Sequence, residues 1–263
     1  MKPYLAIFST YFRLLLQYRA AALAGFATQL FWGFIRIMIF TAFYKASTKT
    51  QPMTLEEVIS YIWLGQAMFA LIPWNANKDI QQLIRTGGVA YELLRPLDLY
   101  FFWMSRIVAA RIVPTLLRAL PMFIAALLFF GLQTPDSFEA VAAWALATAG
   151  AVILSCVITA VSTVLSMWTI SGEGISQLTF PMVVLFSGLV IPLPFFPDWA
   201  QPIVQFLPFR GLGDAPFRLW IGHISPAEAL PVFVHQFLWI IAFLWLGRYL
   251  ISRGLKKLVI QGG

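Results

Sequence analysis

The sequence NKDIQQLIRTGGVAYELLRPLD, residues 77–98, is the longest charged interruption in an otherwise apolar chain. Ile80, Leu83 and Ile84 follow an i, i+3, i+4 spacing, which predicts a short helix with one apolar face. Gly87 and Gly88 are expected to end this helix, because glycine tolerates the left-handed conformation found at helix C-termini. We call this segment the elbow. An apolar stripe on an otherwise charged surface is typical of a docking surface, so the elbow is predicted to bind a soluble partner. The alternative is a solvated connector between two membrane spans.

The composition predicts a membrane protein. Apolar residues make up 60% of the 263 residues and charged residues only 11%, with a mean hydropathy of +0.80. An ordinary soluble domain does not have this composition, so the chain is predicted to be an all-α polytopic membrane protein. Its single cysteine, Cys156, excludes an internal disulfide and a Cys-based zinc site. The formal net charge of +7 comes from basic residues spread beside the predicted spans, which argues against a nucleic-acid partner.

Six hydrophobic runs are expected to cross ~30 Å of hydrocarbon within a single transmembrane domain, residues 1–263. Most of the 18 Lys and Arg fall on the side that would hold both termini and the elbow, so that side is predicted to be cytosolic. The spans are expected at about 20–43, 55–75, 108–132, 139–167, 177–191 and 231–252, with the elbow at 76–99 and short helices at 192–230.

Two segments are expected to lie along the membrane interface. Residues 1–19 have one polar and one apolar face, which predicts an interfacial amphipathic helix. A signal peptide is the alternative, but Arg13 interrupts what would be its apolar core. The stretch 99–132 is longer than one perpendicular crossing needs, so its first part, with Arg106 and Arg111, is expected at the interface.

Polar residues just before apolar runs predict where several helices begin. Thr54 with Glu57, and Ser225 with Glu228, have the spacing of a capping box, in which side chain and backbone satisfy each other. Asp98 is expected to cap the helix after the elbow. These residues set the predicted starts of the second span, of the long helix that contains the third span, and of the sixth span.

Residues 192–230 combine many prolines and aromatic residues with charged ones. Two short helices are expected there, one capped by Asp198 and stopped by Gly211, the other capped by Asp214. Neither is long enough to span. They are predicted to be re-entrant or interfacial helices on the exterior side.

Polar residues inside the spans leave two alternatives open. A charge such as Arg36 costs about 3 kcal/mol at the centre of a span, so Arg36 is expected either to snorkel or to form an intramembrane polar site. Small residues recur every three or four positions along the fourth span. This spacing predicts close packing against another helix; the alternative is a polar path for a substrate. The small residues are Ala140, Ala143, Ala147, Ala151, Ser155, Thr159, Ser162 and Ser166.

The sequence lacks the motifs of several function classes. It contains no G-x-x-x-x-G-K-[ST], H-E-x-x-H or G-x-S-x-G sequence, and His223 and His235 are its only histidines. No enzyme activity, catalytic residue, metal or cofactor site is therefore expected on this chain. A transport protein driven by a separate subunit is predicted; a self-contained secondary carrier or channel, a membrane enzyme and a scaffold are the alternatives.

Three stretches carry a family resemblance: IRTGGVAYELLRPLD at 84–98, SGLVIPLPFFPDWAQPIVQFLPFR at 187–210 and LKKLVIQGG at 255–263. With them the chain resembles the permeases of ABC-2-type ABC transporters, particularly the bacterial drug or viologen exporter branch. The resemblance implies the transmembrane subunit of an ATP-driven exporter in the bacterial inner membrane. Such a subunit would move a hydrophobic or amphipathic compound by alternating access.

The resemblance also implies partners and site residues. The partners are a P-loop ATPase subunit in two copies, which would carry ATP and Mg, and a second permease that is identical or homologous. The elbow is implied to couple to the ATPase through Asp79, Gln82, Leu83, Arg85, Thr86, Gly87, Tyr91, Glu92 and Arg95. An exterior gate is implied at Asp198, Trp199, Phe206, Arg210 and Trp220.

Overall fold

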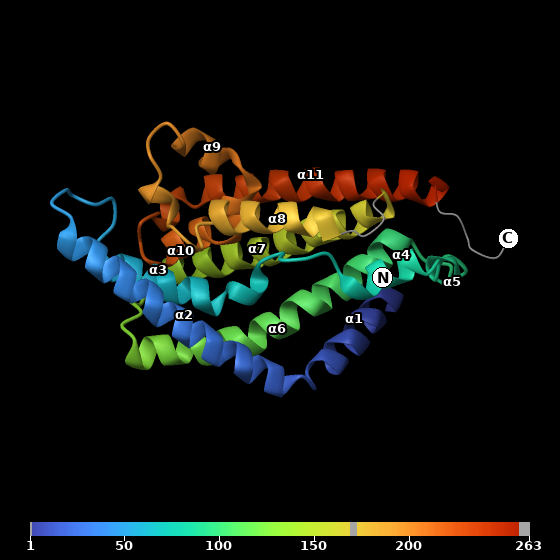
Figure 1. The fold of residues 1–263 in the computed structure, drawn as a ribbon, viewed down its shortest axis with the longest axis horizontal. Helices are drawn as coiled ribbons and strands as arrows, with labels where there is room; N and C mark the ends of the chain where they lie inside the picture. The colour runs from blue at the N-terminus through green and yellow to red at the C-terminus, as the bar shows by residue number, and fades with distance from the viewer. Residues whose placement is uncertain (1, 169–172, 258–263) are drawn as a thin grey trace.

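The computed structural model describes residues 2–168 and 173–257, and within them every regular element is helical. The last six residues of the tail motif, 258–263, lie outside the described residues. Figure 1 shows long helices lying alongside one another, with shorter helices at both ends. The α-helices are α1 Lys2–Leu15, α2 Arg19–Ala46, α3 Leu55–Ala67, α4 Lys78–Arg85, α5 Val89–Leu93, α6 Leu99–Phe129, α7 Phe138–Leu165, α8 Glu173–Phe186, α9 Gln201–Phe206, α10 Asp214–Trp220 and α11 Leu230–Gly254.

Within the described residues, four helices are long and apolar enough to cross a membrane. They are α2, α6, α7 with its 3-10 extension to Trp168, and α11 with the turn that precedes it. The prediction of an all-helical chain with membrane-spanning helices is confirmed to this extent. α3 and α8 have 13 and 14 residues, which is about 20 Å at 1.5 Å per residue and less than ~30 Å of hydrocarbon. Six crossings stay a prediction.

Two of the expected spans end earlier than hydropathy predicted. In the second, the helix stops at Ala67, and Ile72 is extended (φ −67°, ψ 135°), as the residue before Pro73 prefers. In the fifth, Gly188 has a φ of +85°, a left-handed conformation that turns the chain after α8. Hydropathy continues across both places, so it could not mark these helix ends.

α7 is the central helix and packs against α6, α10 and α11. A Cβ at Gly150 would lie 2.4 Å from Gln236 Oε1, so the missing side chain admits the buried Gln236 of α11. Gln236 Nε2 then donates to Ala147 O and Gly211 O, each at 2.8 Å. The predicted packing face is confirmed, because all its members are buried: Ala140, Ala143, Ala147, Ala151, Ser155, Thr159, Ser162 and Ser166.

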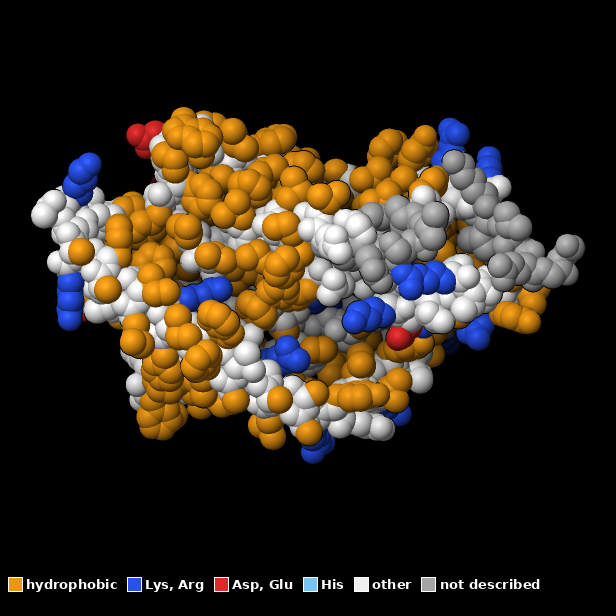
Figure 2. Space-filling view, viewed as in Figure 1, with side chains coloured by type: hydrophobic (Ala, Val, Ile, Leu, Met, Phe, Trp, Pro, Cys, Tyr) orange, Lys and Arg blue, Asp and Glu red, His pale blue; other side chains and the backbone are white. Residues whose placement is uncertain are grey.

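α2 has the smallest buried share of the four candidate spans. It buries only Ala22, Gln29 and Gly33, which lie on one face. A Cβ at Gly33 would come within 2.5 Å of the Trp63 ring, so this glycine lets α3 approach α2 closely. Figure 2 shows hydrophobic side chains over most of the middle of the molecule, as expected for a surface in contact with lipid.

The predicted helix starts are confirmed at three positions. Thr54 forms both bonds of its capping box with Glu57. Asp98 Oδ1 accepts from Phe101 N at 3.0 Å and caps α6. Ser225 N donates to the Glu228 carboxylate at 3.4 Å, at the turn that leads into α11.

The predicted caps of the two short exterior helices are wrong. α9 begins after Ala200, without a side-chain cap, and Asp198 is exposed. This helix ends before Leu207, where Pro208 disfavours helical geometry, rather than at Gly211. Asp214 is the first residue of α10 and turns its carboxylate to other partners, which are described below.

The short elements gather at the two ends of the long helices (Figure 1). α4, α5 and the start of α1 lie at one end. α9, α10 and the loop after α2 lie at the other. α1 runs along α6, and its Tyr4 hydroxyl accepts from Asp98 N at 3.0 Å.

Candidate functional site: the elbow and its polar cavity

The apolar face of α4 fixes the elbow to the bundle. Asn77 Oδ1 accepts from Ile80 N at 3.1 Å and caps the helix. Ile80 is fully buried in a cluster with Trp103 of α6, and Leu83 and Ile84 pack against the same cluster. The predicted stripe is therefore confirmed, and Leu83 faces the bundle rather than solvent.

The turn between α4 and α5 depends on a glycine. Gly87 has a φ of +72°, where a side chain is disfavoured. The helix ends at Thr86, whose backbone N–H donates to Gln82 O at 3.0 Å. On the other side of the turn, Val89 is fully buried and anchors α5. The predicted role of Gly87 as a helix terminator is confirmed.

Glu92 is held inside the elbow by two donors from α6. Its Oε1 accepts from Arg106 Nη1 at 2.8 Å, and its Oε2 accepts from Trp103 Nε1 at 2.6 Å. The Glu92 and Arg106 side chains are only 11% and 8% exposed. Arg106 also lies over the Tyr11 ring, 4.9 Å from its centroid, so the pair joins α5, α6 and α1. The ion pair buries Arg106 within the protein, and its position at the membrane interface stays a prediction.

The outer surface of the elbow carries most of the implied coupling residues. Tyr91 is 78% exposed and Leu94 is 81% exposed, so two large apolar side chains lie on the surface beside charged ones. Sequence reasoning missed Leu94, although it lies three residues after Tyr91 and beyond the end of a short helix. The implied residues that are exposed are Asp79, Gln82, Arg85, Thr86, Tyr91 and Arg95.

Arg111 ties the chain before the elbow to the bundle. From α6, its Nη1 donates to Ala70 O at 3.0 Å and to Ile72 O, and its Nη2 donates to Thr159 Oγ1 of α7 at 2.8 Å. Next to it, Thr163 Oγ1 accepts from the backbone N–H that opens the elbow, at Asn77 (2.9 Å). Arg111 is half-buried, and its position at the membrane interface stays a prediction. It donates to two carbonyls of the turn that follows α3, of which Ile72 O also accepts from Trp74 N at 2.9 Å.

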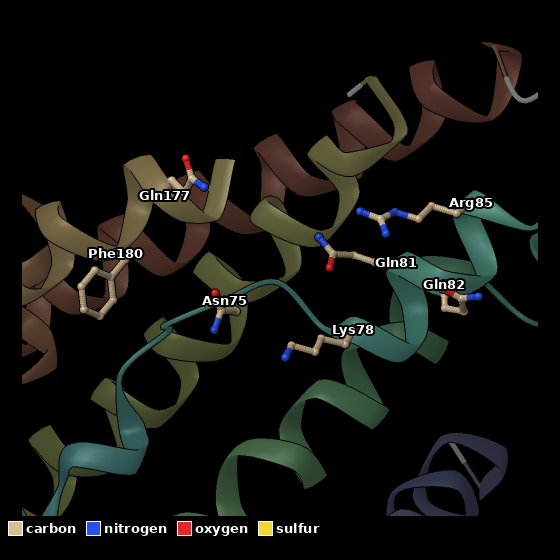
Figure 3. A pocket seen from close by; sticks show the side chains of 7 residues that line it. All are labelled: Asn75, Lys78, Gln81, Gln82, Arg85, Gln177 and Phe180. Carbon is tan, nitrogen blue, oxygen red and sulfur yellow. The ribbon is translucent and has the colours of Figure 1, made fainter. Parts of the chain in front are cut away.

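A polar cavity of about 610 Å³ lies beside α4. Figure 3 shows Gln81 and Arg85 extending from α4 toward the space that faces Gln177 and Phe180 of α8. Two cationic side chains with several amides suit an anionic or strongly polar group. Within residues 2–168 and 173–257, no cluster of His, Cys, Asp and Glu could hold a metal ion. The lining residues are Asn75, Lys78, Gln81, Gln82, Arg85, Gln177 and Phe180.

Comparison with known proteins identifies the family. Residues 30–262 match the family model described as ABC-2 family transporter protein. The chain belongs to this family. As an ABC-2 permease it is the membrane component of an ABC transporter and is not itself catalytic. A search of curated proteins finds no match to the chain.

Arg36 of this permease lies beside a groove of about 580 Å³ on the surface of α2. Its Nη1 donates to Leu189 O, in the segment that follows α8. The carbonyl is available because the chain has left the helix at Gly188. Phe195 of the same segment packs edge-on against Phe40 of α2.

The implied gate residues of the permease do not come together. Trp199 and Phe206 are 76% and 70% exposed, and Asp198 is exposed beside them in the chain. Trp220 is buried against Trp144 of α7, and its Nε1 donates to Gln133 O at 2.7 Å. Arg210 is half-buried, and its Nη1 donates to Gln205 O at 3.2 Å.

Asp214 is a buried centre that sequence reasoning assigned only a capping role. Its Oδ1 accepts from the Tyr61 hydroxyl at 2.9 Å and from Leu193 N at 3.2 Å. Arg218 Nη1 lies 3.6 Å from Oδ2. Asp214 thereby joins α10, α3 and the segment after α8. Tyr61 is 153 residues away in sequence, so no local pattern could have found this contact.

Proposed function

We propose that this chain is the permease subunit of an ATP-driven exporter in a bacterial inner membrane, with the elbow docked on a separate P-loop ATPase. Two copies of the ATPase and a second permease, identical or homologous, would complete the transporter. ATP and Mg would bind to the ATPase alone. The cargo would be hydrophobic or amphipathic and would cross by alternating access.

One observation carries this proposal: the elbow combines a buried anchor with an exposed, partly apolar tip. Ile80 and the Glu92–Arg106 pair hold it to the bundle, while Tyr91 and Leu94 are among the most exposed large side chains of the described chain. An exposed tyrosine on a rigid support is typical of binding hot spots, and Leu94 extends its apolar surface. A passive connector would gain nothing from presenting them to water.

The polar cavity supports a mechanical role for α4. The cavity separates α4 from Gln177 and Phe180 of α8. α4 could shift into this space without displacing packed side chains, whereas its other face is tightly packed through Ile80. Closure of the ATPase subunits would push the elbow and transmit the displacement to α6 through Trp103 and Arg106.

The test is affinity purification of the chain from its native membrane in mild detergent, with each co-purifying protein identified by mass. We expect a stoichiometric soluble protein with a G-x-x-x-x-G-K-[ST] sequence, and its recovery should fall in Tyr91→Ala and Leu94→Ala. Phe138→Ala is the matched control, because Phe138 is 82% exposed but starts α7, away from the elbow. Recovery of the chain alone from membranes where the complex survives would contradict the proposal.

A further inference from the structure

The groove beside Arg36 has a lining that suits an amphipathic ligand. The volume of the groove, about 580 Å³, falls in the range of ~300–1,000 Å³ that is usual for ligand pockets. Aromatic side chains line it from both sides, Trp32 and Phe43 on α2 and Phe195 on the segment after α8. Arg36 is the one charged residue among the lining residues.

The charge of Arg36 has no counterion among the described residues. None of the ion pairs found there includes Arg36. A guanidinium has five N–H groups, and the bond to Leu189 O uses one of them. Each Arg36 side-chain nitrogen either has a hydrogen-bond partner or is accessible, so the donors that Leu189 O does not use can be reached from the groove. They are available to bind a carboxylate or another oxyanion.

The position of Arg36 within the groove argues against a resident phospholipid. Trp32 lies one turn before Arg36 on α2, and Phe40 and Phe43 lie one and two turns after it. Apolar lining therefore continues on both sides of the guanidinium, along the helix axis. A phospholipid with its phosphate at Arg36 would press its remaining polar headgroup against these rings. A small acid with apolar parts on either side fits better.

We infer that the groove binds an anionic amphiphile, an aromatic or aliphatic acid whose oxyanion pairs with Arg36 while its apolar part contacts the rings. If the chain is a transport subunit, as proposed above, this binding preference identifies hydrophobic organic acids as its cargo. The same charge disfavours a cationic cargo such as a viologen, because Arg36 has no acidic neighbour to offset the repulsion.

The test compares three radiolabelled probes that share one ring system: 1-naphthaleneacetate, its neutral amide, and the cation 1-naphthylmethylammonium. Binding is measured on the purified full chain in phosphatidylcholine nanodiscs, without ATP. We expect the acid to bind about tenfold or more tightly than the amide, as a charge-assisted bond implies, and the cation least tightly. Equal binding of acid and amide would overturn the inference.

Variants connect this preference to Arg36. Arg36→Gln keeps an N–H donor for Leu189 O but should abolish the preference for the acid, while Arg36→Lys should retain most of it. Arg19→Gln, at the exposed start of α2, is the matched control and should bind as the native chain does. Should Arg36→Gln fail to fold, Ile39→Glu places a carboxylate one turn away to neutralise Arg36, and it should remove the preference equally.

Anionic lipid distinguishes the two possible sources of the oxyanion. Phosphatidylglycerol added to the nanodiscs should leave acid binding unchanged, and strong competition by this lipid would overturn the assignment to cargo. An unchanged preference for the acid in folded Arg36→Gln would also overturn it. Since the assay needs neither ATP nor ATPase, its failure would leave the proposed docking of the elbow untouched.

Discussion

Replacing Glu92 should loosen the elbow without altering its exposed tip. Glu92 accepts bonds of 2.8 Å and 2.6 Å from Arg106 and Trp103, and both members of the ion pair are about nine-tenths buried. Glu92→Gln weakens charge-assisted bonds worth ~1.5–3 kcal/mol each. Glu92→Leu leaves Arg106 buried and unpaired, for which about 3–5 kcal/mol is expected. The loss should appear as a lower midpoint in SDS titration and as faster amide exchange over residues 78–98.

A double variant separates the pair from the packing around it. Glu92→Leu combined with Arg106→Met removes both charges, so stability should recover by most of the loss in the single variant. The control is Arg248→Gln, which breaks an ion pair with Asp98 whose side chains are 53% and 39% exposed, and about 1 kcal/mol or less is expected. The reasoning is refuted if Glu92→Leu behaves like this control, or if the double variant is less stable than the single one.

Three further predictions concern other parts of the chain. Gly33→Val should destabilise by about 1–3 kcal/mol, because its Cβ would overlap the Trp63 ring; the thermal unfolding midpoint measures this. Arg111→Met should cost about 1–3 kcal/mol and speed amide exchange over residues 69–77, because it removes the donor to Ala70 O and one of the two donors to Ile72 O. Burial, and then the charge of Arg218, lower the pKa of His223 below 6.5. Its stabilising contribution should be complete above about pH 6.5 and decline as pH falls through the lowered pKa.

Each of these has a matched comparison. Gly174→Ala, where no atom of the described residues lies within 4 Å of the new Cβ, should not lower the midpoint, and equal loss at both glycines would contradict the overlap argument. Unchanged exchange in Arg111→Met would mean that the carbonyls find other donors. His223→Gln should flatten the pH dependence of the unfolding midpoint. If the midpoint of this variant depends on pH as steeply as that of the native chain, the pH dependence comes from another group.

Local patterns predicted the elbow well. The Ile80 stripe, the Gly87 turn and the Asp98 cap each depend on residues within four positions of one another, so spacing alone determines them. The same holds for the small-residue face of α7, because the spacing of the small residues shows which side of the helix another helix can approach closely. These features follow from helix geometry.

Buried polar groups could not be predicted in the same way. The partners of Arg111 lie 39 to 48 residues away, and the hydroxyl bound by Asp214 lies 153 residues away. Sequence shows only that a charge near a span needs a partner, and it could not name the partners of Arg111 and Arg106. Likewise, the family resemblance implied Glu92 as a coupling residue, and a helix of five residues is too short for its period to reveal that this side chain is buried.

The polar contacts also imply which helices move together. Through Arg111 and Thr163, the segment leading into the elbow is bound to α6 and α7, so a displaced elbow should carry both helices with it. α2 is the least buried candidate span, and Arg36 bonds it to the segment after α8. Conformational changes include small sliding of packed helices. Since α2 has the smallest buried share of the candidate spans, we expect elbow motion to shift α2 against its neighbours while α7 and α11 stay packed. The Arg36 groove lies between α2 and the segment after α8, so a displacement of the elbow that shifts α2 would change the affinity of the groove for its ligand.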